Sequence, residues 1–130
     1  MPYDLTIFGP TEEQKETLRA AEEAVEHLKQ RRVPVVRLHD YSGMASWALE
    51  SWHQLWLGRS LELIDGMQSE WNGRRLMSAV VLLRAFIETI AAHCNIVDKG
   101  RNMLPKEGLR EFHKSLMRAM FGAKMRSGRL

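Results

Sequence analysis

The residues from Leu76 to Val97 form the segment that most constrains how this chain can fold. The segment is long enough for a helix, and apolar residues occupy almost every side of that helix rather than one stripe. Arg84 and Glu88 lie near its middle, four residues apart, so their side chains share one helix face and can pair. A helix that is apolar all round is typical of a buried core helix. The sequence therefore predicts a central buried helix with an ion pair inside the fold.

The Arg84–Glu88 pair has two interpretations from the sequence. Truncating one partner of a buried pair typically costs about 3–5 kcal/mol, whereas apolar replacement of both is often tolerated. In the first interpretation it is a structural ion pair whose remaining hydrogen bonds come from other helices or from a second subunit. In the second, Arg84 binds an anionic group in a cavity and Glu88 orients the guanidinium.

Length and composition indicate one domain over residues 1–130. Cys94 is the single cysteine, so an intramolecular disulfide is impossible and a buried thiol in a reducing compartment is expected. The longest stretch without a charged residue is nine residues, against about 20 for a spanning helix. Residues 1–10 lack the pattern of a signal peptide. We therefore expect a cytoplasmic protein that does not contact a membrane.

Periodicity predicts an all-α fold with no series of strands. Thr11 and Gln14 have the spacing of a capping box, and Pro105 suits the first position of a helix. The expected helices cover residues 11–32, 43–71, 74–97 and 105–121. Residues 123–130 form a basic tail. These elements predict a four-helix, bundle-like array around the buried third helix.

Four tryptophans lie on the second expected helix. They are Trp47, Trp52, Trp56 and Trp71. A platform that stacks single-stranded bases presents exposed aromatic rings beside basic residues, and the charges flanking these tryptophans are mainly acidic. The pattern therefore favours core packing or a dimer interface over base stacking.

No metal or cofactor site is predicted. Glu50 and His53 have the Glu-x-x-His spacing of di-iron bundles, but such a site needs a second copy of the motif and two further carboxylates. One cysteine and five scattered histidines offer no zinc cluster. His93 and Cys94 are neighbours in sequence, so on a helix their side chains diverge by about 100° and do not form a nucleophile and base.

Positive charge is concentrated at the C-terminus. Residues 1–98 hold ten Lys/Arg and fourteen Asp/Glu, whereas residues 99–130 hold nine and two, a balance of +7. Arg110, Lys114 and Arg118 recur at four-residue intervals and form a stripe on the fourth expected helix. The tail extends it with Lys124, Arg126 and Arg129. The stripe is either a solvated helix face or a binding surface for RNA or an acidic protein.

Two runs carry a resemblance to a known family. Leu82-Leu83-Arg84-Ala85-Phe86-Ile87-Glu88-Thr89-Ile90 follows a Trp-bearing helix, and His113-Lys114-Ser115-Leu116-Met117-Arg118-Ala119-Met120-Phe121-Gly122 comes later. Over residues 45–125 the chain resembles bacterial HEPN-like helical proteins. The resemblance implies an all-α bundle, often dimeric, of the kind found in RNA-cleaving toxins, in phage-defence systems and in relatives of unassigned function.

The chain departs from the pattern of the catalytic members of that family. Those members carry an Arg and a His separated by four to six residues on one helix. Arg84 and His93 have eight residues between them, which places them on opposite faces of a straight helix. Arg32 and His39 match the spacing but enclose Pro34, which interrupts a helix. The family pattern also suggests further helices after residue 122, so the resemblance implies a shortened member or an N-terminal fragment.

These observations favour a HEPN-like helical interaction module, RNA-associated, of a bacterial defence or toxin-type system. We expect a homodimer without catalytic activity. One alternative is a HEPN-type ribonuclease in which Arg84 and Glu88 line the cleft and His113 contributes acid–base chemistry. The other alternative is a structural dimerisation domain in which the tryptophan-bearing helix is the interface.

Overall fold

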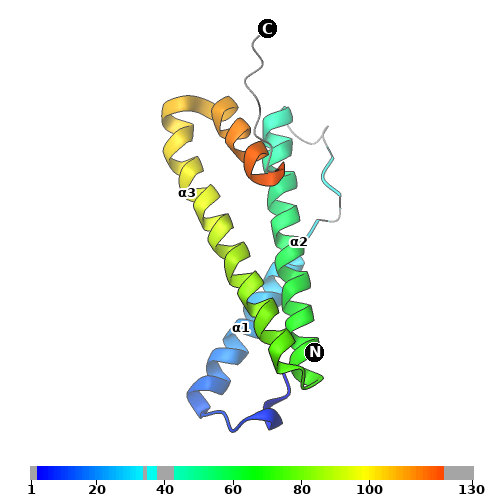
Figure 1. Ribbon diagram of the computed structural model, residues 1–130. Coiled ribbons are helices and arrows are strands. Elements are labelled where there is room, and N and C mark those ends of the chain that lie inside the picture. The colour runs from blue at the N-terminus through cyan, green and yellow to red at the C-terminus, as the bar shows by residue number, and fades with distance from the viewer. Residues whose placement is uncertain (1–2, 34, 38–42, 122–130) are drawn as a thin grey trace. The chain divides into compact units, whose positions relative to one another are not determined.

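The chain is all-α in the computed structural model, which describes residues 3–33, 35–37 and 43–121. A short 3-10 turn, η1 (Leu5–Ile7), precedes three helices: α1 (Glu12–Gln30), α2 (Met44–Asn72) and α3 (Leu76–Phe121) (Figure 1). No strand occurs in these described ranges. The predicted all-α class is therefore confirmed, whereas the basic tail at 123–130 lies outside the described residues.

The chain packs as two compact units. The first unit comprises Met1–Val33 and Trp56–Ile90, and the second comprises Pro34–Leu55 and Ala91–Leu130. Because α2 and α3 are each long enough to enter both units, the two units share these helices. The domain expected over residues 1–130 therefore has two centres of packing.

The start of α1 is set by the predicted capping box. The Thr11 hydroxyl accepts a hydrogen bond from the Gln14 amide at 3.2 Å, and the Gln14 side chain accepts one from the Thr11 amide at 2.9 Å. These two bonds satisfy donors that a helix N-terminus leaves without intrahelical partners. Along the helix Leu18, Val25 and Leu28 are half-buried and no residue is fully buried. Helix α1 therefore contacts the unit through a narrow apolar stripe and is otherwise solvated.

The first unit has its core along α2. Leu57, Leu61 and Ile64 are buried on one side of α2, and Ala79 of α3 is buried as well. Polar groups also join the two helices, since the Trp56 indole and the Arg59 guanidinium both donate to Thr89 at 3.3 Å. One side of the first part of α3 is therefore committed to packing within this unit.

The other side of this part of α3 is not covered, contrary to the prediction of a central buried third helix. Val80 is 58% exposed and Val81 is 63% exposed, and Leu76, Met77, Leu83 and Ile87 are exposed too. A central helix needs neighbours on every side, but within the first unit α1 supplies only its narrow apolar stripe. The four-helix array around a buried third helix is therefore not confirmed.

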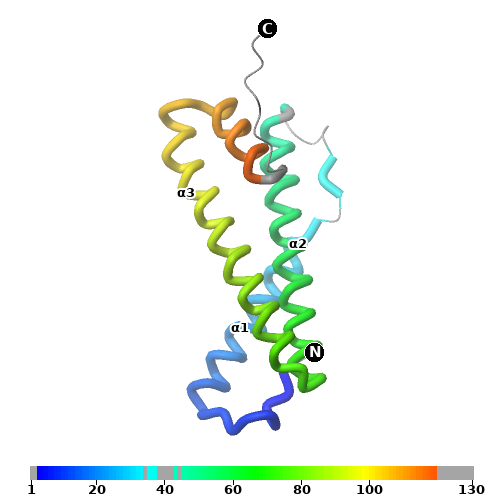
Figure 2. The backbone as a smooth tube through the Cα atoms, in the orientation of Figure 1, coloured from blue at the N-terminus to red at the C-terminus, as the bar shows by residue number. Residues whose placement is uncertain are grey.

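The expected break between the helices at residues 74–97 and 105–121 is also wrong. The helix continues through residues 98–104 and through Pro105, and regular helical geometry is interrupted at Gly108. Gly108 has φ 81° and ψ 175°, a conformation that a side chain would disfavour and that glycine adopts readily. The backbone turns back on itself in this region (Figure 2). The expected fourth helix is therefore the last part of α3, following Gly108.

The second unit has its core where this turn brings the end of α3 back. Ile96, Phe112 and Leu116 form a buried cluster, and Leu49 and Trp52 pack against it. The approach is close, because a Cβ atom at Gly100 would lie 2.9 Å from the Phe112 ring. The absence of a side chain at position 100 therefore makes room for the aromatic ring.

Replacing Leu116 with alanine is expected to destabilise the second unit. Leu116 is 1% exposed, so Leu116→Ala removes buried methyl groups and leaves a cavity, which costs about 2–5 kcal/mol. Urea unfolding followed by circular dichroism measures the loss. Leu55→Ala is the matched control, because Leu55 is exposed and its truncation should change stability by less than about 0.5 kcal/mol. Equal losses in the two variants would contradict this description of the core.

Candidate interaction surface

The most distinctive surface of the first unit is one side of α3, which we name the outer face. Its residues are exposed and recur at helical spacing. They are Met77, Val80, Val81, Arg84, Ile87 and Glu88. Four of the six are apolar, and a contiguous apolar patch of this kind on a folded surface usually marks a site of interaction.

The opposite side of the same helix explains why the outer face is left open. Ala79 is buried, and Leu82, Phe86 and Thr89 are half-buried. The Thr89 carbonyl and hydroxyl accept the hydrogen bonds from Trp56 and Arg59 of α2. A helix that is apolar all round has two faces to bury, and α2 accounts for the inner one.

Arg84 and Glu88 form the predicted ion pair, but on the surface. Arg84 Nε lies 3.0 Å from Glu88 Oε1, and the two side chains are 82% and 66% exposed. The prediction of burial was wrong because it assumed that every side of the helix meets another element. An exposed pair at this spacing contributes only about 0.3–0.5 kcal/mol, so the stability of the single chain does not depend on it.

The same helix passes a test of length and composition for a membrane span. Within Leu76–Ala119 an 18-residue window has a mean hydropathy of 1.6, and 6% of that window is buried. It is the one such helix in the part of the chain that the structure describes. The core helix of a soluble protein can pass this test, but such a helix is mostly buried, and this one is not. Its apolar surface is therefore largely open in the single chain.

An apolar hollow adjoins the outer face. It measures about 310 Å³, and Val80 and Leu83 of α3 form part of its lining. Other lining residues come from the N-terminal segment, α1 and α2, including Phe8, Leu18 and Trp71. The Phe8 and Trp71 rings meet edge to face, with centroids 5.5 Å apart. The hollow extends the apolar surface beyond the helix itself.

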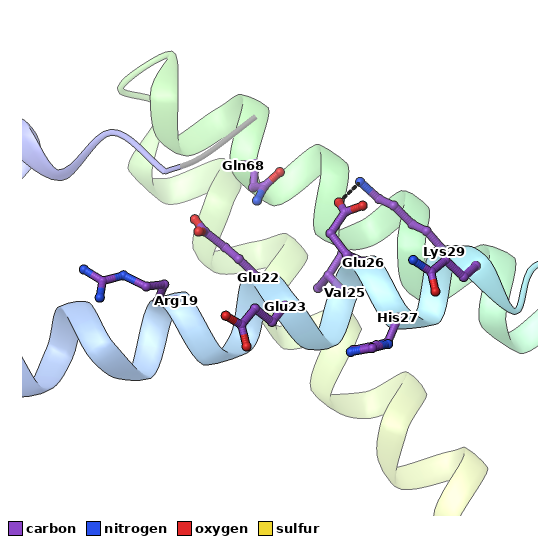
Figure 3. Close-up of a pocket in the computed structure, with 9 residues that line it drawn as sticks. Arg19, Glu22, Glu23, Val25, Glu26, His27, Lys29 and Gln68 are labelled. Carbon is purple, nitrogen blue, oxygen red and sulfur yellow. Dashed lines mark hydrogen bonds and ion pairs between the residues drawn. The ribbon is translucent and has the colours of Figure 1, made fainter.

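A second hollow of the first unit has a different character. It measures about 430 Å³ and is lined mainly by α1, with Gln68 from α2 (Figure 3). Glu22, Glu23 and Glu26 contribute carboxylates, and the Lys29 ammonium lies 3.2 Å from Glu26 (Figure 3). Lys29 is exposed, so this hollow is a solvated charged surface.

The tryptophans make contacts within the chain. All four are half-buried, and three of the indole groups donate to main-chain carbonyls. These hydrogen bonds run from Trp47 to Val36 at 2.9 Å, from Trp56 to Thr89 at 3.3 Å and from Trp71 to Asp4 at 2.9 Å. Buried indole groups generally need such partners. These contacts favour the core-packing interpretation of the tryptophans, and their role as an interface stays a prediction.

The fourth tryptophan belongs to an aromatic cluster that the sequence did not predict. The Trp52 and His93 rings are stacked with centroids 4.8 Å apart, and the His53 ring lies 6.0 Å from His93. Burial, with a further contribution from the nearby His53, lowers the pKa of His93. The Glu-x-x-His spacing singles out His53 in the sequence, but no sequence pattern predicts its proximity to His93, forty residues later. No group of three metal-ligating side chains occurs in the described ranges.

The remaining candidate residues lie in the second unit. His113 is half-buried on the last part of α3, whereas Arg84 and Glu88 belong to the first unit. Arg110 and Arg118 are exposed, and the Lys114 ammonium lies 3.0 Å from Glu111. This hydrogen bond, together with the surrounding positive charge, lowers the pKa of Glu111. The basic stripe predicted on this helix thus contains a carboxylate. Its expected extension, Lys124, Arg126 and Arg129, lies outside the described residues.

Comparison with family models, with curated proteins and with solved structures finds no match to this chain. Its function is therefore inferred from its own residues.

The His93 cluster predicts a dependence of stability on pH. Because the pKa of His93 is lowered in the folded chain, the unfolded chain binds the proton more readily. The stability that the neutral His93 side chain contributes is present in full above about pH 6.5. It is lost as the pH falls through the pKa of His93 in the folded chain. NMR titration should place the pKa of His93 below 6.5, and His93→Gln should flatten the pH dependence of urea unfolding. A pKa at or above 6.5 would contradict the packing described.

Proposed function

We propose that this chain is a helical interaction module that forms a homodimer through the outer face of α3. The observation that carries the proposal is the exposure of Val80, Val81 and their apolar neighbours on a helix whose inner face is already packed. Burying such a surface is favourable by roughly 25 cal/mol per Å² of apolar area. In the dimer the first part of α3 becomes a central helix, which is the position that its composition predicts.

A second copy fits this surface better than a membrane does. Arg84 and Glu88 lie in the middle of the apolar window, and a charged side chain at the centre of a bilayer costs about 2.5–3.5 kcal/mol even on the mildest scales. A protein partner can instead provide each charge with an opposite charge. A second copy carries both signs on the same surface, so it meets this requirement without any further component.

The family and the location stay part of this proposal. A dimeric, all-α module agrees with the resemblance of Leu82–Ile90 and His113–Gly122 to HEPN-like proteins, and we place it in the cytoplasm, in a bacterial defence or toxin-type system. We propose no catalytic role. The exposure of the Arg84–Glu88 pair supports an interaction role over a ribonuclease cleft.

Charges introduced on the outer face are expected to separate the dimer. Burying a valine contributes about 1.5–3 kcal/mol to the free energy of dimerisation. In a two-fold symmetric dimer each substitution occurs twice, so its effect is doubled. Val80→Glu and Val81→Glu should each therefore weaken dimerisation at least about 100-fold. Sedimentation equilibrium of the purified full chain measures the change.

The matched control for these variants is Val35→Glu, because Val35 is equally exposed but lies outside the outer face. It should dimerise like the original chain. A monomeric original chain would overturn the proposal, and cosedimentation with phosphatidylcholine vesicles would then assign the surface to a lipid bilayer.

RNA association is a second candidate, favoured by the exposure of Arg110 and Arg118 on one stretch of α3. If both contact phosphates, Arg110→Gln/Arg118→Gln should weaken binding to single-stranded RNA. The slope of log affinity against log salt should fall by about 1.4, since each phosphate contact contributes about 0.7. Lys15→Gln/Arg19→Gln on α1 removes the same charge and should leave the slope unchanged. Equal slopes for all three proteins would argue against this role.

A further inference from the structure

We infer that Arg84 and Glu88 set an antiparallel orientation in the dimer, with Arg84 of each copy paired to Glu88 of the other. This inference rests on the proposed homodimer and concerns how its two copies are aligned. It begins from the position of the pair, which lies on the outer face together with Val80, Val81 and Ile87.

The pair is able to take a second partner. The hydrogen bond that joins it runs from Arg84 Nε to Glu88 Oε1, and both side chains are largely exposed. A guanidinium carries five N–H donors, and a carboxylate has two acceptor oxygens. One contact at 3.0 Å therefore leaves donors and an acceptor oxygen for a neighbouring chain. Once an apolar interface excludes water, charges that lack a partner become costly, so each dimer arrangement has to match them.

The order of the two charges selects the orientation. A two-fold axis that crosses α3 between Arg84 and Glu88 reverses the second copy, so each positive charge faces a negative one. A parallel arrangement instead places Arg84 against Arg84 and Glu88 against Glu88. Juxtaposed like charges at an interface cost several kcal/mol, so the antiparallel arrangement is favoured. The charge pattern is thus complementary to itself in one orientation.

Exchanging the two charges tests this inference. Arg84→Glu/Glu88→Arg keeps a salt bridge within the helix and should form its own antiparallel dimer. Mixed with the original chain, however, it would place Arg against Arg and Glu against Glu. Mixed dimers should therefore fall at least about tenfold below the half expected from random mixing. Because the exchange leaves the mass unchanged, one protein is labelled with ¹⁵N and the dimers are counted by native mass spectrometry.

Each other outcome is informative. Random mixing of two dimeric proteins would overturn the role of the pair while leaving the homodimer intact. An excess of mixed dimers would overturn the antiparallel orientation, since parallel copies prefer opposite charges at equal positions. A monomeric original chain would overturn the homodimer and this inference together. Glu111→Lys/Lys114→Glu exchanges a half-exposed pair on the same helix and should mix at random.

A second pair of variants covers the case in which the exchanged protein does not fold. Arg84→Glu makes both positions acidic, and Glu88→Arg makes both basic. Each should dimerise weakly alone, and a mixture should form acidic–basic dimers in large excess, with the excess reduced at high salt. This result tests whether the pairs of the two copies meet, in either orientation. Equal formation of all dimers by these variants would overturn the inference.

Discussion

The two-sided apolar surface of the first part of α3 is the constraint on which the rest of the structure depends. Its inner side, from Ala79 to Thr89, is packed and hydrogen-bonded against α2. Its outer side has no equivalent neighbour in the first unit. Because apolar surface is costly in water, this open outer side is what supports the proposed association with a second copy.

The two units pack their helices differently. The second unit builds a compact cluster around Ile96, Phe112 and Leu116 because the chain reverses at Gly108 and returns α3 onto itself. The first unit has no such return. There α1 contributes a half-buried stripe and carries many solvated charges, so α2 is the main cover for α3. The open surface is thus a consequence of where the chain turns.

Local features could be predicted from the sequence, whereas the environment of each helix could not. The capping box at Thr11 and the all-α class follow from short-range patterns. The pairing of Arg84 with Glu88 also follows from spacing, but their exposure depends on which elements surround them. Residues 98–104 were not expected to be helical, but the helix continues through them and through Pro105 and is interrupted only at Gly108. The contact of His53 with His93 joins distant positions, which no periodicity within one helix reveals.

The reversal at Gly108 has a consequence for the order in which the chain acquires structure. It brings Phe112 against residues close to it in sequence, such as Ile96 and Gly100, so this contact requires closure of only a short loop. Contacts of low sequence separation form quickly. We therefore expect the helical hairpin on either side of Gly108 to form early. The hydrogen bond between Asp4 and Asn72, which are 68 residues apart, is expected to form later.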